Sequence, residues 1–145
     1  MRFLPLGILL ILLASCLDEP DCISTASNKV AISLRRIAED SARTVKFDRI
    51  LVSGTDSVFY ESDSLSFLHL PVNPATTETT FRFYYELKMD SLVLSYTRET
   101  KVVSPQCGAF NYFQELSVVS TSFGQVIVDN SQLSISGTAN LTIKL

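Results

Sequence analysis

The heptapeptide FRFYYEL at residues 81–87 carries the pattern that decides the fold. Large apolar side chains occupy the odd positions from Phe81 to Leu87, whereas Arg82, Tyr84 and Glu86 occupy the even ones. Successive side chains of a strand point to opposite faces, so this alternation puts one face on a core and the other in water. Residues 81–87 are therefore predicted to form a half-buried strand.

The same period-two pattern recurs along most of the chain from Asn28 onward, with turn-forming residues between the segments. The other expected strands are residues 30–34, 45–52, 58–60, 65–70, 92–97, 112–119, 125–128, 133–136 and 141–145. About nine or ten short strands at this spacing are typical of an antiparallel sandwich or a small barrel. We favour an all-β fold, an antiparallel β-sandwich that is immunoglobulin-like in general architecture. At most one short helix is expected, over residues 34–43, where an irregular crossover would fit equally well.

The N-terminal residues predict the cellular location. Arg2 precedes an apolar run over residues 3–13, which is shorter than the about 20 residues that a membrane-spanning helix needs. It is typical of a cleaved secretory signal. The sequence Leu13-Ala14-Ser15-Cys16 resembles the lipobox of bacterial lipoproteins, in which Cys16 would be acylated, for example with palmitate, and begin the mature chain.

This resemblance divides the chain into three parts. Residues 1–15 are expected to be a signal peptide, residues 16–27 the lipidated cysteine with an acidic tether, and residues 28–145 the β-sandwich domain. The expected partner is the membrane, through a lipid anchor at Cys16. The expected location is the cell envelope, as an outer-membrane lipoprotein, and the sequence leaves open whether the domain faces the periplasm or the cell surface.

The three cysteines fit this address. If Cys16 carries lipid, Cys22 and Cys107 remain, and an even number of cysteines in an oxidising compartment favours a disulfide. Such a bond would close a loop of about 85 residues and contribute about 4–5 kcal/mol on the chain-entropy model. Two reduced buried thiols are the alternative. Cysteines and a histidine so far apart in sequence predict no metal site, and no cofactor is expected.

The tether Leu17-Asp18-Glu19-Pro20-Asp21 is acidic. In the Bacteroidota, acidic residues just after a lipidated cysteine resemble a signal for export to the cell surface. A hydrophilic spacer explains the same residues.

Several segments together resemble a family of small Bacteroidota lipoproteins of uncharacterised function. They are residues 16–22, 68–74 (LHLPVNP), 80–81, 92–96 (LVLSY), 104–108 (SPQCG) and 140–143 (NLTI). The resemblance covers most of the mature chain. It implies a lipid-anchored β domain without an established activity, so it provides no catalytic residues.

Four serines follow an aspartate and precede a small or apolar residue: Ser41, Ser57, Ser64 and Ser91. This pattern resembles the O-glycosylation sites of Bacteroidota proteins outside the cytoplasm. The alternative is turn chemistry, because Asp and Ser side chains both form hydrogen bonds with the local backbone.

No motif points to catalysis. His69 is the sole histidine, it lies in a predicted strand, and no hydrolase or metalloprotease signature is present. The net charge of −3 and the absence of a Lys/Arg run make nucleic acid an unlikely partner. We therefore expect a lipid-anchored, non-catalytic binding or structural module with an envelope protein or glycan as partner. The alternatives are an envelope enzyme with carboxylate-based chemistry and a small-ligand carrier.

Aromatic residues are concentrated in and beside three predicted strands, and they suggest either a binding patch or simply good strand formers. They are Tyr84, Tyr85, Tyr96, Phe110, Tyr112 and Phe113.

Overall fold

The computed structural model describes residue 22 and residues 24–54 and 58–145. The predicted signal peptide, Cys16 and Ser57 lie outside the described residues. Within the described part, nine strands form two packed sheets, and no helix is present. The prediction of an all-β sandwich is confirmed.

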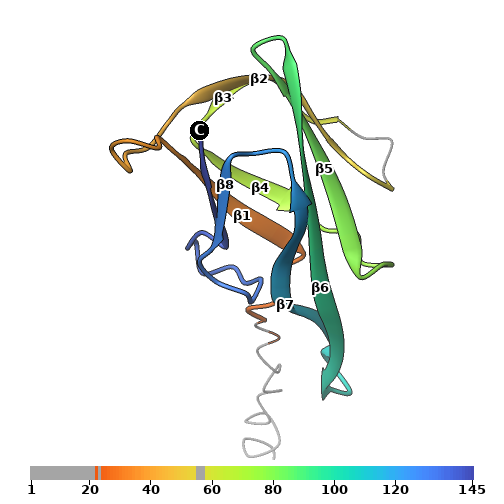
Figure 1. The fold of residues 1–145 in the computed structure, drawn as a ribbon. Coiled ribbons are helices and arrows are strands. Elements are labelled where there is room, and N and C mark those ends of the chain that lie inside the picture. The colour runs from red at the N-terminus through yellow and green to blue at the C-terminus, as the bar shows by residue number, and fades with distance from the viewer. Residues whose placement is uncertain (1–21, 23, 55–57) are drawn as a thin grey trace, which may run out of the picture.

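One sheet has four strands in the order β4-β1-β9-β8 (Figure 1). Its strands are β1 (Lys29–Arg35), β4 (Phe67–Pro71), β8 (Gln125–Val128) and β9 (Leu141–Lys144). The other has five strands in the order β3-β2-β5-β6-β7. Its strands are β2 (Val45–Val52), β3 (Val58–Leu65), β5 (Glu78–Tyr85), β6 (Lys88–Ser104) and β7 (Gly108–Thr121). All pairings are antiparallel except that of β1 with β9, which run parallel.

The core lies between the two sheets and follows the alternation seen in the sequence. The five-stranded sheet supplies the aromatic side chains Phe47, Phe81, Phe83, Tyr85, Tyr96 and Phe113. The four-stranded sheet supplies the aliphatic side chains Val30, Ile32, Leu34, Leu68, Leu70, Leu141 and Ile143. Neighbouring rings in the core have centroids 5.2–6.5 Å apart, in tilted or edge-on arrangements that aromatic pairs prefer. These contacts join neighbouring strands on the inner face of the five-stranded sheet and hold Phe123, from the connection after β7, against β5.

The structure settles three local expectations. Residues 133–136 form no strand, because Leu133 is buried, Ile135 is 65% exposed and only an isolated bridge joins Ser134 to Ala26. Of the two alternatives for residues 34–43, the structure shows the irregular crossover: residues 34 and 35 end β1, and residues 36–43 form no helix. Arg36 N–H donates to the Ser41 carbonyl, and Arg43 N–H donates to the Leu34 carbonyl, which closes a wide loop.

The third correction concerns the turn between β5 and β6. Glu86 and Leu87 have positive φ angles of 49° and 60°, so the chain reverses there and the strand predicted over residues 81–87 ends at Tyr85. Leu87 is fully exposed instead of sharing the apolar face of Phe81 and Phe83. A two-residue turn with both φ angles positive matches the twist of the flanking strands.

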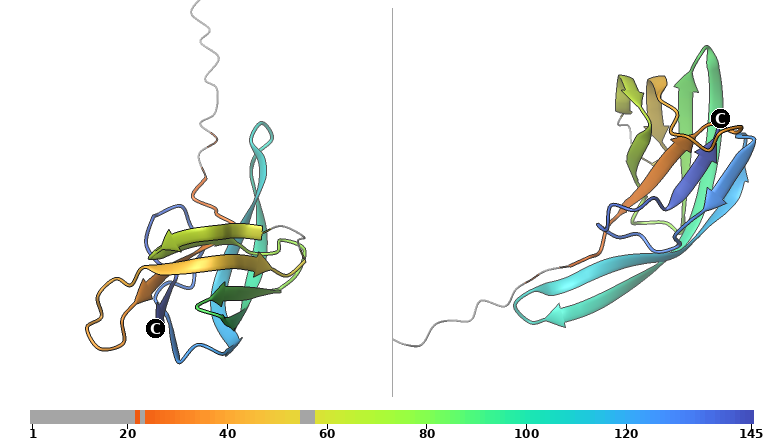
Figure 2. Two further views of the ribbon diagram at one scale, coloured as in Figure 1. Left: turned by 90° about the horizontal axis from the view of Figure 1, so that it is seen from above. Right: turned by 90° about the vertical axis from the view of Figure 1, so that its left-hand side faces the viewer.

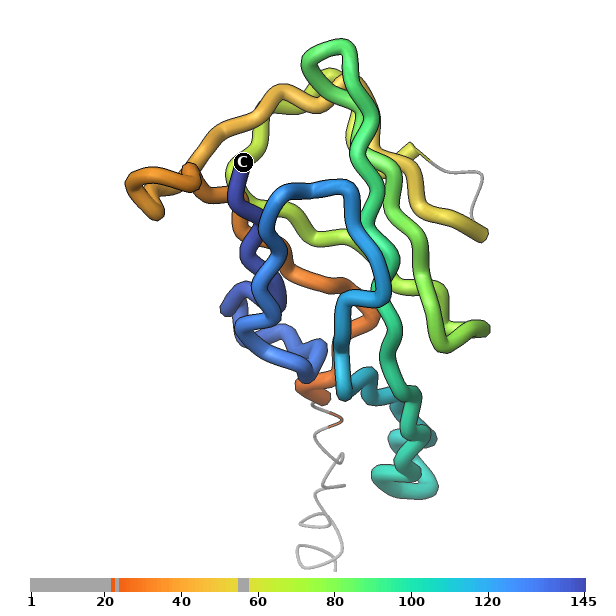
Figure 3. The backbone as a smooth tube through the Cα atoms, viewed as in Figure 1, coloured from red at the N-terminus to blue at the C-terminus, as the bar shows by residue number. Residues whose placement is uncertain are grey.

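The hairpin of β6 and β7 is longer than the predicted short strands, with 17 and 14 residues. Its lower half extends beyond the sandwich as a two-stranded arm (Figure 2). Residues 97–103 of β6 are all exposed. On β7, Phe113 is the core residue nearest to the arm. In the tube view the tip of the arm lies on the same side of the molecule as residues 24–27 (Figure 3).

Candidate functional site

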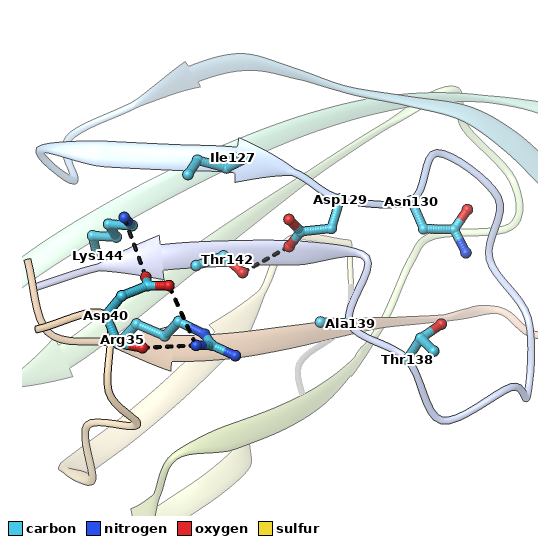
Figure 4. Close-up of a pocket in the computed structure, with 9 residues that line it drawn as sticks. All are labelled: Arg35, Asp40, Ile127, Asp129, Asn130, Thr138, Ala139, Thr142 and Lys144. Carbon is cyan, nitrogen blue, oxygen red and sulfur yellow. Dashed lines mark hydrogen bonds and ion pairs between the residues drawn. The ribbon is translucent and has the colours of Figure 1, made fainter.

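One candidate site is an open groove on the outer face of the four-stranded sheet, with a volume of about 680 Å³ (Figure 4). Strand alternation creates it: Leu34 and Ile143 point into the core, so Arg35, Thr142 and Lys144 point outward. The groove is lined by Arg35, Asp40, Ile127, Asp129, Asn130, Thr138, Ala139, Thr142 and Lys144. Most of these side chains carry hydrogen-bonding groups.

Asp40 organises the charges at one end of the groove. The Asp40 carboxylate lies 3.5 Å from Arg35 Nη1 and 3.2 Å from Lys144 Nζ. The backbone carbonyl of Asp40 accepts a hydrogen bond from Arg35 Nη1 at 2.7 Å. The Asp40 backbone has a φ of 49°, a left-handed conformation that Asp tolerates better than most residues. The carboxylate is thereby turned toward both cations, which neighbour each other across the parallel pairing of β1 and β9.

Asp129 lies at the other end, where its carboxylate accepts a hydrogen bond from Thr142 Oγ1 at 2.7 Å. The two acidic side chains of the groove therefore both have partners already. Exposed donors and acceptors beside the apolar Ile127 suit a hydroxyl-rich or peptide ligand. Within residues 22, 24–54 and 58–145, no group of three or more His, Cys, Asp or Glu side chains could hold a metal ion.

Asn140 fixes the loop that leads to the groove. It is buried, and its Oδ1 accepts a hydrogen bond from the Ala31 N–H at 3.0 Å. Its Nδ2 donates to the carbonyls of Asn130 and Gln132 at 3.0 and 2.9 Å. One amide side chain thus ties the loop over residues 130–140 to strand β1.

The predicted disulfide is confirmed. Cys22 and Cys107 are bonded at an S–S distance of 2.02 Å, with their Cα atoms 5.4 Å apart. Cys107 lies in the turn between β6 and β7, where its N–H donates to Ser104 Oγ and Gly108 has a φ of 72°. The bond therefore attaches the start of the described chain to the tip of the arm.

The three described serines of the Asp-Ser pattern lie in different surroundings. Ser64 is exposed on the edge strand β3, whereas Ser41 lies half-buried in the loop after β1. Ser91 is half-buried within β6, between β5 and β7. The structure does not bring these serines together. Of the three pairs that the structure describes, Asp40-Ser41 alone lies in a loop, so turn chemistry does not account for the pairs at 63–64 and 90–91.

The suggested aromatic patch is divided between the core and the surface. Tyr85, Tyr96 and Phe113 are buried, and burial together with a hydrogen bond to Asp90 raises the pKa of Tyr85. Tyr84 lies under the Arg49 guanidinium at 4.5 Å, and Tyr112 lies 5.4 Å from Lys101 Nζ.

His69 is exposed on β4, as expected for a strand histidine facing solvent. Its ring contacts Phe67 edge-on at a centroid distance of 5.1 Å.

Sequence reasoning did not find the groove residues. The outward position of Thr142 and Lys144 follows from the alternation, but their approach to Arg35 depends on the parallel register of β1 and β9. Asp40 was noted only as the neighbour of Ser41. No sequence signal indicated its positive φ or its place between two cations.

Comparison with known proteins gives one match. A model of a family of unknown function (DUF6452) matches residues 44–145, which is more than half of the chain and reaches from the start of β2 to the last residue. Neither the curated proteins nor the solved structures contain a match. Among the described residues, no helix has the length and apolar character to cross a membrane.

Proposed function

Since the chain belongs to this family of unknown function (DUF6452), we propose its function from its address, its disulfide and its groove. The protein is a lipid-anchored, non-catalytic binding module of the bacterial cell envelope, of the type of the small Bacteroidota lipoproteins. Residues 1–15 are removed, Cys16 is acylated, and the anchor keeps the sandwich at the outer membrane. The outer face of the four-stranded sheet then meets an envelope protein or a glycan.

The disulfide is the observation that supports this proposal best. With Cys22 and Cys107 bonded to each other, the third cysteine of the sequence has no cysteine of this chain left to pair with. Structural disulfides persist in oxidising compartments, which agrees with export. Cys16 follows the apolar run after the small residues Ala14 and Ser15, in the position of a lipid acceptor. Acylation with more than one chain would give stable anchoring, whereas one chain alone is marginal.

The groove supports binding better than catalysis. A carboxylate-based enzyme needs one acid and one base that are available to the substrate. Here Asp40 is paired with Arg35 and Lys144, and Asp129 accepts a hydrogen bond from Thr142. The paired carboxylates and the neighbouring hydroxyl and amide groups offer fixed hydrogen-bond partners to a polar ligand.

Cys16→Ala is expected to release the protein from the membrane fraction, because the substitution removes the acyl acceptor. Cell fractionation and protease treatment of intact cells measure this. The matched control is the double variant Cys22→Ala/Cys107→Ala, which also loses cysteines but keeps the acceptor and should stay with the membrane. Equal solubility of the wild type and Cys16→Ala would refute the anchor. Cleavage of the anchored protein on intact cells would mean that the domain faces outward.

Ser64 is the glycosylation candidate that we expect to be modified, because it is the exposed one of the three described serines. The intact mass of protein from its native membrane should exceed that of polypeptide plus acyl chains, and Ser64→Ala should lower the excess by a glycan mass. Ser120→Ala is the control, since Ser120 is exposed but follows Val119 instead of an aspartate. A native mass explained by polypeptide and lipid alone would contradict the modification.

A further inference from the structure

The tip of the arm has an apolar surface that the sandwich does not use. From Val102 to Phe110 the sequence VVSPQCGAF contains no charged residue. Val102 is 76% exposed and Val103 is 47% exposed. Val102 pairs with Ala109 across the hairpin, and Val103 lies at a register shift before Ser104 pairs with Gly108. Two exposed valines therefore stand next to each other close to the tip.

Behind the uncharged tip, the side chains of the arm become charged and polar. Lys101 pairs with Phe110 across the hairpin, and Glu99 pairs with Tyr112. Lys101 Nζ lies 3.1 Å from the Glu99 carboxylate and 5.4 Å from the centre of the Tyr112 ring. Tyrosine and lysine at the boundary between an apolar end and a polar stem are typical of residues at a membrane–water interface.

The disulfide limits how far the tip can lie from Cys16. Six residue steps separate Cys16 from Cys22, and a fully extended chain of that length spans at most about 20–22 Å. The disulfide adds a Cα–Cα distance of 5.4 Å to reach Cys107. An acyl chain on Cys16 would therefore bring the tip of the arm within reach of the lipid headgroups.

We propose that the arm tip, residues 102–110, inserts into the headgroup region of the bilayer that holds the acyl chains of Cys16. This inference rests on the proposed lipid anchor. The uncharged part of the arm extends about 10 Å beyond the Lys101–Phe110 pair at the usual rise of a strand. That length matches the about 5–10 Å to which interfacial segments are buried. The arm acts as a second, non-covalent contact that sets the orientation of the sandwich on the membrane.

A bilayer fits this surface better than a protein groove does. A docked strand or hairpin commonly presents alternate side chains to specific pockets on one side. The tip presents exposed valines, and no charge between residues 102 and 110 would provide register with a partner. A lipid surface requires no such register.

The chain contains no tryptophan, so a single introduced indole reports its own surroundings. The mature acylated protein carrying Val103→Trp is reconstituted in phosphatidylcholine vesicles with or without bromine on the acyl chains. Val102→Trp is a second tip probe, and Val119→Trp, at a 53% exposed site on β7 about 30 Å along the strand from the tip, is the control. All three sites are exposed, so the melting temperatures should match that of the wild type.

We expect bromination to remove about half of the emission of the tip probes, because the bromines lie at the depth that interfacial segments reach. The emission maximum of the tip probes should also shift to shorter wavelength. The emission of Val119→Trp should stay unquenched, with its maximum at the longer wavelength of an indole in water. Co-flotation with the vesicles but no quenching at either tip site would overturn the membrane contact and leave the anchor intact. Protein that does not float with the vesicles would overturn the anchor and the contact together. Equal quenching at all three sites would also overturn the proposal. So would a blue shift that disappears when the protein is diluted, because that shift would come from a protein dimer.

Discussion

Replacing Cys22 and Cys107 together by serine is expected to lower the free energy of unfolding by about 4–5 kcal/mol. The bond closes a loop of 85 residues in the unfolded chain, and its loss gives that chain back its conformational freedom. Urea denaturation of the oxidised wild type and of the double variant measures the difference. Wild-type protein treated with a thiol reductant should match the variant, and a midpoint unaffected by both would contradict the expectation.

The same variant should loosen one part of the molecule more than the rest. A two-stranded hairpin without a third strand or a packed face is only marginally stable in water. Between Phe113 and the tip, the arm has neither a third strand nor a packed face. Its hydrogen bonds therefore depend on the disulfide at the tip. Amide hydrogen exchange should therefore rise over residues 97–112, while residues 81–85 in the centre of the sheet keep their protection. Uniform protection loss would show that the bond acts only through the unfolded state.

Asn140→Ala is expected to cost about 3 kcal/mol, because each buried hydrogen-bonding group left without a partner costs about 1–3 kcal/mol. The substitution leaves the Ala31 N–H without its acceptor and removes the donor to two loop carbonyls. The carbonyls of Asn130 and Gln132 can bind water once the loop moves. The buried Ala31 N–H is therefore expected to account for most of the loss.

Thermal and urea unfolding measure the effect, with Gln132→Ala as the matched control. Gln132 is exposed in the same loop, and a change there should alter stability by less than about 0.5 kcal/mol. Asn140→Asp keeps the acceptor for Ala31 but replaces the donor by a carboxylate facing two carbonyls, so it should be nearly as destabilising as Asn140→Ala. Full stability of Asn140→Ala would mean that the loop is held by other contacts.

The sequence predicted the sandwich because its core residues obey period-two alternation with few exceptions. Val30, Ile32 and Leu34, and likewise Phe81 and Phe83, are all fully buried or nearly so. The disulfide followed from cysteine number and compartment. Both inferences are local or compositional, and neither requires knowledge of which strands pair.

The sequence-based predictions failed where contacts between residues distant in sequence determine the local structure. Leu133 is buried without a strand because its N–H donates to the Phe113 carbonyl, a contact 20 residues distant in sequence. The groove depends on the parallel register of β1 with β9, from opposite ends of the chain. The arm was missed because residues 97–101 are all polar and lack the apolar alternation that marks the other strands. They form a strand through pairing with β7, which depends on a hairpin of this length.

The disulfide would also divide any mechanical load on the proposed lipid anchor. A pull on the chain upstream of Cys22 has two covalent routes into the domain, one along the backbone to β1 and one through Cys107 into β6 and β7. β1 belongs to the four-stranded sheet, and β6 and β7 belong to the five-stranded sheet. Tension is thereby shared between both layers of the sandwich, so that peeling one layer from the other does not release the load.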